Sequence, residues 1–377
     1  MEVAIVEAMN PALPALGGAE TYSVNLLNHL LKSGIRVLFI GVSYGTLQPA
    51  QGQLSFLPVS SNASRGNLGY VWSLLLSRSF SHVPPKAIIH VQRPEYALPF
   101  VLFCRRNPMV VTLHGRILHG VKLKQSRAMA VMYRMVESFC FRRSAAIIVV
   151  DDGTKEFYEK EYPWLREKIQ VIPVGIDLAK FKTLEKEKLR AKWGFGSTER
   201  VVMFVGRLEI EKDLGFLIES FHVVLRHVPH ARLVLVGDGR DRKRLEGLAS
   251  DLNPREVLFM GAQQPDSMPE ILNCADVVAL CSLFEGSPTV VKEALACGVP
   301  VVTTDVGDVA QIIKGDVIGR IVPKDAGRYG QAIIEILGRE DVENTRRECT
   351  NAASTFGFDE IGARTVKLYE KLAKWDR

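Results

Sequence analysis

The sequence predicts an α/β protein built from two doubly wound, Rossmann-like domains that face a cleft. Apolar runs of strand length alternate with segments of helical periodicity, which is the pattern of parallel sheets covered by helices. The alternation occurs twice, before and after a segment with proline and glycine at residues 169–177. A chain of 377 residues is also too long for a single hydrophobic core.

The first half begins with a βαβ pattern. A buried strand is expected at residues 3–8, and a loop with two prolines and two glycines leads to helical spacing over residues 19–32. Residues 46–68 are rich in Gly, Ser, Asn and Pro, so we expect an irregular connection there. Further strands are expected at 35–41, 87–91, 109–114 and 145–150, and a helix near 126–141.

The second half repeats the alternation and ends in a helix. The strand expected at 169–177 ends the first half, and the domain boundary follows it. In the second half strands are expected at 201–205, 231–236, 256–261, 276–281 and 317–323, and helices at 184–192, 213–228, 240–251 and 267–273. Residues 359–375 have helical periodicity, with Ile361, Leu368, Leu372 and Trp375 on one face. We therefore predict domains at 1–174 and 175–356, followed by a terminal helix at 357–377.

Residues 281–303 carry the clearest chemical pattern. An apolar run precedes a loop with Glu285, and a helix with Glu293 follows before the next apolar run. Ser287 suits the N-cap and Pro288 the first helical position, while Gly298 suits the position after the helix, where φ is often positive. A helix N-terminus binds anions. Carboxylates on either side of it indicate a ligand that carries both phosphate and hydroxyl groups.

Charge is unevenly distributed. The net charge is +6, with +8 in residues 1–172 and −2 in the remainder, and residues 105–143 hold nine basic residues against Glu137 alone. In this stretch Met129, Met132, Met135 and Phe139 lie at helical spacing among arginines. Two interpretations stay open: a helix packed on the sheet with its cations in water, or a helix resting on an anionic membrane surface.

The other totals indicate an ordinary cytoplasmic protein. No apolar run reaches membrane-spanning length, and the first ten residues carry two glutamates where a secretion signal would be basic. The six cysteines form no C-x-x-C pair and are expected to be reduced and mostly buried. We expect no contact with nucleic acid.

Six short blocks, in order along the chain, resemble the family-four retaining glycosyltransferases, which have the GT-B fold. The segment FEGSPTVVKEALACGVPVV matches the family's E-x7-E signature. The other blocks are Gly17-Gly18-Ala19-Glu20, Thr112-Leu113-His114-Gly115, Ile172-Pro173 with Gly175-Ile176-Asp177, Val205-Gly206-Arg207-Leu208 with Lys212, and Val236-Gly237-Asp238-Gly239. Val174 and Asp151-Asp152 depart from the family pattern, which often has Asn and Ser there.

The resemblance implies a metal-independent transfer, with no cofactor, from a nucleotide-sugar to an acceptor. It places the donor in the carboxyl-terminal domain, the acceptor in the amino-terminal domain, and the last helix back on the first domain. Arg207 and Lys212 would stabilise the departing diphosphate, Glu293 would bind ribose, and Glu285 and His114 would contact the donor sugar. The remaining donor-binding residues implied are Gly17, Gly18, Gly261, Gly286, Ser287, Pro288, Thr289 and Val290, with no metal ligand.

The expected acceptor is a carbohydrate, a lipid-linked molecule or a phosphorylated molecule, with peripheral membrane contact through residues 105–143 as one interpretation. The alternatives are a GT-B-fold nucleotide-sugar epimerase and a non-catalytic nucleotide-sugar-binding module. A dinucleotide-dependent dehydrogenase is disfavoured, because Arg242 occupies the place of the third glycine after Gly237 and Gly239. We interpret residues 236–239 as a structural turn.

Overall fold

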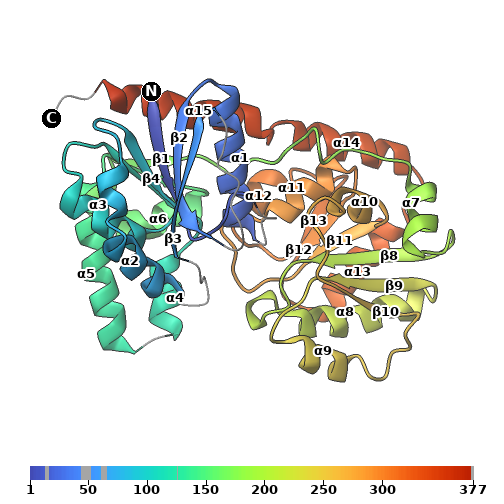
Figure 1. Cartoon of the computed structure of the whole chain (residues 1–377). Coiled ribbons are helices and arrows are strands. Elements are labelled where there is room, and N and C mark those ends of the chain that lie inside the picture. The colour runs from blue at the N-terminus through green and yellow to red at the C-terminus, as the bar shows by residue number, and fades with distance from the viewer. Residues whose placement is uncertain (13–16, 44–51, 61–65, 125, 375–377) are drawn as a thin grey trace. The chain divides into compact units, whose positions relative to one another are not determined.

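The computed structural model describes residues 1–12, 17–43, 52–60, 66–124 and 126–374 (Figure 1). The chain forms two compact units, Met1–Gly175 with Phe358–Arg377, and Ile176–Gly357. We call them the N-unit and the C-unit. Each contains one parallel β-sheet with helices against it, as the alternating pattern predicts.

The N-unit sheet has the strand order β3-β2-β1-β4-β5-β6-β7. Its inner strands are mostly buried apolar runs, as expected for a parallel sheet covered on both faces, whereas the edge strands β3 and β7 are only partly buried. They are β1 (Glu2–Val6), β2 (Arg36–Val42), β3 (Leu54–Ser60), β4 (Ile88–Val91), β5 (Met109–Leu113), β6 (Ala146–Val149) and β7 (Ile169–Val171).

Two clusters of apolar side chains cover the two faces of this sheet. One face packs against α2 (Gly66–Leu76), α3 (Leu98–Phe103), α5 (Arg127–Arg143) and α6 (Asp152–Glu161). The other packs against α1 (Gly18–Lys32) and α15 (Phe358–Ala373), so the last helix belongs to the N-unit. The helix α4 (Ile117–Lys124) precedes α5.

The expectation of an irregular connection over residues 46–68 is wrong for its described part. Residues Leu54–Ser60 form β3, and α2 begins at Gly66. The strand LSFLPVS contains Pro58, which has no N–H to donate and argues against a central strand. Because β3 lies at the edge of the sheet, the proline is tolerated there. Residues 46–51 and 61–65 lie outside the described residues.

The α15 helix is held to the sheet by polar as well as apolar contacts. Ile361, Leu368 and Leu372 are buried, as their spacing predicts, while Trp375 lies outside the described residues. Tyr369 is also buried, and its hydroxyl lies 2.5 Å from Nδ1 of His90 on β4. His90 Nε2 lies 2.6 Å from the Thr112 hydroxyl. Both ring nitrogens of this buried histidine are therefore satisfied.

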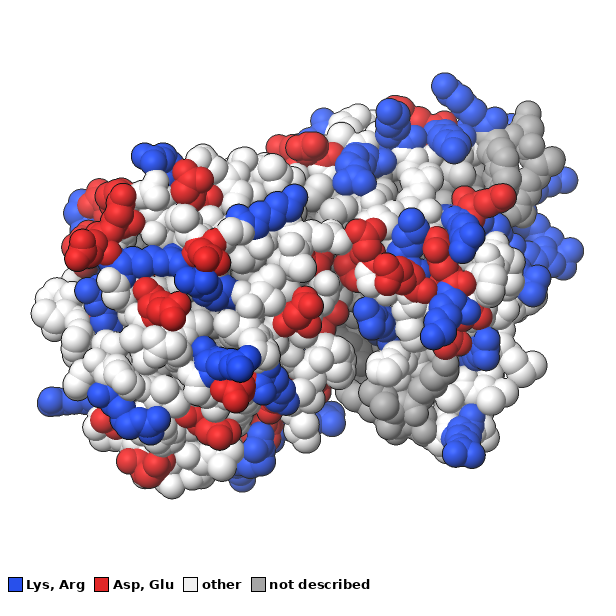
Figure 2. Space-filling model, turned by 180° about the vertical axis from the view of Figure 1, so that it is seen from behind, with Lys and Arg blue, Asp and Glu red and all other residues white. Residues whose placement is uncertain are grey.

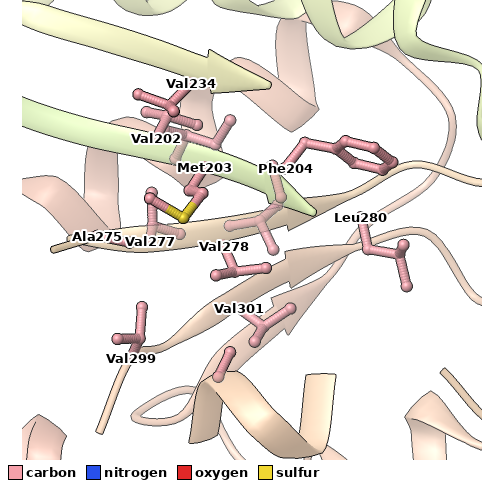
Figure 3. Close-up of a cluster of buried hydrophobic side chains, with 14 of the residues drawn as sticks. Val202, Met203, Phe204, Val234, Ala275, Val277, Val278, Leu280, Val299 and Val301 are labelled. Atoms are coloured by element: carbon pink, nitrogen blue, oxygen red, sulfur yellow. The ribbon is translucent and has the colours of Figure 1, made fainter. Parts of the chain in front are cut away.

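The C-unit sheet has the order β10-β9-β8-β11-β12-β13. Figure 3 shows Val202, Met203 and Phe204 of its strand β8 among Val234, Val277, Val278, Leu280 and Val301 of neighbouring strands. The strands are β8 (Arg200–Val205), β9 (Ala231–Val236), β10 (Val257–Gly261), β11 (Val277–Leu280), β12 (Val301–Thr303) and β13 (Gly319–Ile321). The helices are α7 (Lys186–Trp193), α8 (Leu214–His227), α9 (Arg242–Leu248), α10 (Met268–Asn273), α11 (Thr289–Ala296), α12 (Val309–Ile312), α13 (Ala326–Leu337) and α14 (Val342–Ser354).

Candidate active site

The candidate site of the C-unit lies where the strand order of its sheet reverses. The strands β10, β9 and β8 follow one another on one side of this point, and β11 lies next to β8 on the other side. Open α/β sheets bind ligands outside the carboxyl ends of the strands at such a switch point. Arg207 and Lys212 follow β8, and Glu285 follows β11, so the topology brings these three residues to the switch point.

Lys212 and Glu285 are in direct contact. The Lys212 ammonium lies 2.5 Å from Oε1 of Glu285, and the Ser282 hydroxyl donates to the same oxygen at 2.7 Å. Both side chains are largely buried. Two further bonds join their loops, because Leu283 N–H donates to the Glu211 carbonyl and Cys281 Sγ donates to the Lys212 carbonyl. A cation and a carboxylate are thus fixed together beside the switch point.

Arg207 is exposed at the carboxyl end of β8. Among the described residues, no carboxylate forms an ion pair with its guanidinium. The backbone around it is tightly packed against the β9 turn: a Cβ at Gly237, where φ is +136°, would lie 1.9 Å from the Gly206 carbonyl oxygen. A Cβ at Gly239 would lie 2.2 Å from the Leu208 carbonyl oxygen. These glycines therefore have a structural role, as we predicted, and they fix the loop that carries Arg207.

The start of α11 differs from the sequence prediction. The helix begins at Thr289, Pro288 occupies the N-cap, and no side chain caps the helix. Ser287 is not the N-cap, because its hydroxyl donates to Asp308 Oδ2 at 2.7 Å. The end is as predicted, since Gly298 follows the helix with φ +75°. Because no side chain caps it, the N-terminus of α11 remains available to an external anion.

A buried ion pair that the sequence reasoning missed holds the loop before α11. Lys292 is fully buried, and its ammonium lies 2.9 Å from Asp308 Oδ2 and 2.6 Å from the Ser287 hydroxyl. Close backbone packing adds to this, because a Cβ at Gly307, where φ is +58°, would lie 2.0 Å from the Gly286 carbonyl oxygen. A lysine on the apolar face of a predicted helix is the signal that would have indicated a buried partner.

Glu293 lies on α11 and is half-buried. Burial raises the pKa of its carboxyl from the ordinary 4.5 to about 7, although a hydrogen bond with Thr289 and the charge of Lys180 act in the opposite direction. Val290 lies in the first turn of the same helix and is half-buried. Gly261 ends β10 with φ +75°, and its carbonyl accepts from Gly237 N–H at 2.8 Å.

The other predicted residues belong to the N-unit, at the carboxyl ends of its strands. Gly17 is the N-cap of α1, and apart from its chain neighbours no atom of the described residues lies within 4 Å of the place where its Cβ would be. Gly18 is the first, exposed residue of that helix. His114 follows β5, with Nε2 3.0 Å from Gln92 Oε1, and burial together with the charge of Arg93 lowers its pKa to about 3. The imidazole is therefore neutral near pH 7.

Glu7 and Gln92 are buried polar residues of the N-unit that were not predicted. Glu7 follows β1, and burial raises the pKa of its carboxyl to about 7. Within the described part of the chain, its Oε2 and the Nε2 of buried Gln92 have no hydrogen-bond partner. A glutamate at the end of an otherwise apolar strand was the available signal for Glu7.

The C-unit residues provide the elements of an anion and hydroxyl site. Arg207 and Lys212 supply positive charge, and the N-terminus of α11 supplies N–H groups without a side-chain cap. Glu285 and Glu293 are carboxyl groups that can accept hydrogen bonds from hydroxyls.

Two family models match the chain. The model described as Glycosyltransferase Family 4 matches residues 16–180, and the model described as Glycosyl transferases group 1 matches residues 185–356. An uncharacterized glycosyltransferase of Methanocaldococcus jannaschii is 30% identical over 279 residues, which cover 70% of each chain. The UDP-Gal:alpha-D-GlcNAc-diphosphoundecaprenol alpha-1,3-galactosyltransferase of Escherichia coli is 28% identical over 251 residues, covering 65% of this chain and 64% of that protein.

Solved structures of low sequence identity share the fold. Sucrose-phosphate synthase from Thermosynechococcus elongatus superposes with a TM-score of 0.83 at 21% identity, over 98% of both chains. Anabaena HepE in complex with UDP-glucose gives a TM-score of 0.78 at 20% identity, over 98% of this chain and 100% of that one. The two α/β units thus form the GT-B fold, and the chain belongs to the family-4 glycosyltransferases.

Proposed function

We propose that the chain is a retaining glycosyltransferase that moves a sugar from a nucleotide-sugar donor, of UDP or GDP type, to an acceptor hydroxyl. The observation that carries this proposal is the set of groups at the switch point of the C-unit sheet. Arg207 and the Lys212–Glu285 pair lie there, and the N-terminus of α11 has no side-chain cap. This arrangement fits a ligand with both a diphosphate and hydroxyl groups.

Each group has a role in this proposal. The Arg207 fork and the Lys212 ammonium stabilise the diphosphate as negative charge develops on it during departure. Within residues 287–290, the backbone N–H groups of Ser287, Thr289 and Val290 cradle a phosphate or the sugar, since Pro288 has no N–H. Gly261 lies beside the base. Glu293 accepts from the ribose hydroxyls, and Glu285 contacts the hydroxyls of the donor sugar.

The mechanism follows from the same groups. The sugar is transferred on the face from which the nucleotide departs, and the donor phosphate helps to deprotonate the acceptor hydroxyl. Such a step needs no protein base and no metal. His114 is neutral near pH 7, and its single N–H lies on Nε2, because Nε2 faces the acceptor oxygen of Gln92. Its Nδ1 can therefore accept a hydrogen bond, and in the proposal it contacts a hydroxyl of the donor sugar. In the proposal the absence of side chains at Gly17 and Gly18 lets the pyrophosphate approach the backbone closely. The open space beside Gly17 among the described residues supports this role.

The N-unit is the acceptor-binding domain in this proposal, and the acceptor is carbohydrate, lipid-linked or phosphorylated. The names of similar proteins support a nucleotide-sugar donor and a lipid-linked or carbohydrate acceptor. The similar Escherichia coli protein is named as a transferase of galactose from UDP-Gal to a diphosphoundecaprenol-linked sugar, and the similar Anabaena structure contains UDP-glucose. The proposal includes a peripheral contact with an anionic membrane through residues 105–143.

The first experiment identifies the nucleotide. A thermal-shift panel of UDP, GDP, ADP and their sugars should contain one ligand that raises the melting temperature, because ligand at 100 times its Kd stabilises by about 2.7 kcal/mol. Transfer and hydrolysis of that donor are then measured for Glu293→Ala and Arg207→Ala. Loss of a hydrogen bond to a charged group costs about 1.5–3 kcal/mol, so nucleotide affinity should fall roughly 10- to 150-fold in Glu293→Ala.

The matched control is Lys188→Ala, which removes an exposed C-unit cation. It should leave donor binding and turnover unchanged. Turnover like that of the wild type in both Glu293→Ala and Arg207→Ala would refute the assignment. Interconversion of donor sugars without any acceptor would point to an epimerase instead.

A further inference from the structure

The α2 helix of the N-unit exposes an apolar stripe. Leu68, Trp72 and Leu76 follow one another at intervals of four residues, so they lie on one side of the helix. They are 61%, 64% and 79% exposed, while Tyr70, Val71 and Leu74 on the other side are buried in the core. Isolated apolar residues on a surface are normal, but three in register on one helix indicate an interaction face.

Two neighbouring helices extend this apolar surface. The short helix α3 packs against both α2 and α5 (Figure 1). Its side chains Leu102 and Phe103 are exposed. On α5, Val131, Met135 and Phe139 form a second exposed stripe at intervals of four residues. We call the exposed side chains of α2, α3 and α5 together the apolar face; they are Leu68, Trp72, Leu76, Leu102, Phe103, Met129, Val131, Met132, Met135 and Phe139.

The chain around the apolar face is basic. Residues 21–150 contain fifteen Lys and Arg, and their only acidic residues are Glu95 and Glu137, both buried. Exposed arginines follow α3 at Arg105 and Arg106 and begin α5 at Arg127. On the face in Figure 2, acidic and basic side chains are interspersed over both units, so the excess of positive charge belongs to residues 21–150 and not to the whole N-unit. Of the arginines on α5, Arg134 pairs with Glu161 of α6 at 3.6 Å. Exposed apolar side chains of α2, α3 and α5 are thus combined with a sequence stretch whose charge is mainly positive.

We propose that the apolar face is a docking surface for an anionic lipid bilayer, with Trp72 and Leu76 of α2 as its main inserting side chains. Large apolar groups flanked by arginines match the boundary between acyl chains and anionic headgroups, where tryptophan is also favoured. A second copy of the chain is a poorer occupant, because it would bring two surfaces of the same positive charge together. Within the described residues no helix is long and apolar enough to cross a bilayer, so the contact proposed is a surface contact.

The inference extends the membrane contact of the proposed function beyond residues 105–143 to α2, which lacks charged residues. It rests on the proposed function in one respect only: a lipid-linked acceptor would explain why the protein binds a membrane. Nucleotide binding to the full chain in the absence of vesicles tests the proposed function separately.

The test is co-sedimentation of the full chain with vesicles of phosphatidylcholine alone and of phosphatidylcholine with phosphatidylglycerol. The wild type should bind the anionic vesicles preferentially, and binding should weaken with salt. The variant Trp72→Ser/Leu76→Ser should lower the partition coefficient at least roughly tenfold, because two large apolar groups no longer insert. The control variant Leu248→Ser/Val342→Ser removes two exposed apolar C-unit side chains and should bind like the wild type.

All four substitutions are at exposed positions, so an unchanged melting temperature should accompany them. The inference is overturned if the Trp72→Ser/Leu76→Ser variant and the control bind vesicles equally, or if the wild type shows no preference for anionic lipid. A dimer in sedimentation velocity that only Trp72→Ser/Leu76→Ser abolishes would assign the apolar face to a second copy and would also overturn it.

Discussion

Replacing Lys292 by methionine tests the ion pair behind the candidate donor site. The Lys292 ammonium is fully buried on the C-unit helix α11 and contacts Asp308 and Ser287. Methionine fills a similar volume but leaves the Asp308 carboxylate, which is 4% exposed, without its cation. In this variant the Ser287 hydroxyl can still donate to Asp308 Oδ2, but Oδ1 is buried and has no hydrogen-bond partner within the described chain, so no other cation replaces the lysine.

The magnitude follows from the burial of both partners. Removing one partner of a buried ion pair costs about 3–5 kcal/mol, because an uncompensated charge stays in a medium of low dielectric constant. For a unit of this size each kcal/mol shifts the melting temperature by about 2–4 °C, so we expect a decrease of about 6–20 °C.

Differential scanning calorimetry and urea unfolding followed by circular dichroism measure this loss. Lys188→Met is the matched control, because Lys188 pairs with Glu185 at the surface and should lose no more than about 1 kcal/mol. The double variant Lys292→Met/Asp308→Asn removes both charges and should recover part of the loss. A Lys292→Met protein within about 0.5 kcal/mol of the wild type would refute a buried, paired lysine at this place, since surface substitutions have effects of that size.

Two further predictions concern titration and the last helix. The pKa of Glu293 is raised to about 7 by burial, so the folded state holds more protons than the unfolded state between pH 4.5 and 7, and stability falls as pH rises through this window. The glutamine of Glu293→Gln cannot titrate, so the gain in the free energy of unfolding over the wild type should be larger at pH 8 than at pH 4.5. Urea unfolding at both pH values measures this gain. An equal gain at both pH values would contradict the prediction. Tyr369→Phe removes the hydroxyl that meets buried His90 and should cost about 1–3 kcal/mol with an unchanged m value, whereas unchanged stability would show that this contact does not hold α15.

Most of the fold was predictable because local pattern and tertiary environment agree. The strands of both sheets are short apolar runs, and helical spacing identifies α1, α8 and α15 within one to two residues. Among the strands of the described residues only β3 was missed, because Pro58 and nearby glycine and serine residues are typical of a loop. Its place at the sheet edge removes the penalty for proline, and edge position is a property of the pairing that the local sequence does not contain. The helices for which we made no prediction are α2, α3, α4, α6, α12, α13 and α14.

Less of the site was predictable, since its contacts join segments that are distant in sequence. Strand order explains why Lys212 and Glu285 meet across more than seventy residues, which spacing alone does not show. The partner of Ser287 is Asp308, twenty-one residues further on. The local capping rule predicted that the Ser287 hydroxyl accepts from backbone N–H groups at the start of α11. In the structure this hydroxyl is hydrogen-bonded to the buried Lys292–Asp308 ion pair.

The failed capping prediction has a consequence for function. A serine hydroxyl at the N-cap would satisfy orphan N–H groups of α11 and add about 1 kcal/mol of stability. In the structure Lys292 and Asp308 hold that hydroxyl away from the helix, and Pro288 at the N-cap has no side-chain acceptor. The helix α11 therefore lacks a stabilising side-chain cap, and the buried Lys292–Asp308 ion pair holds Ser287 away from the N-cap position. Such a loss of local stability is typical of a binding site, because the N–H groups left open are those that an anionic ligand needs.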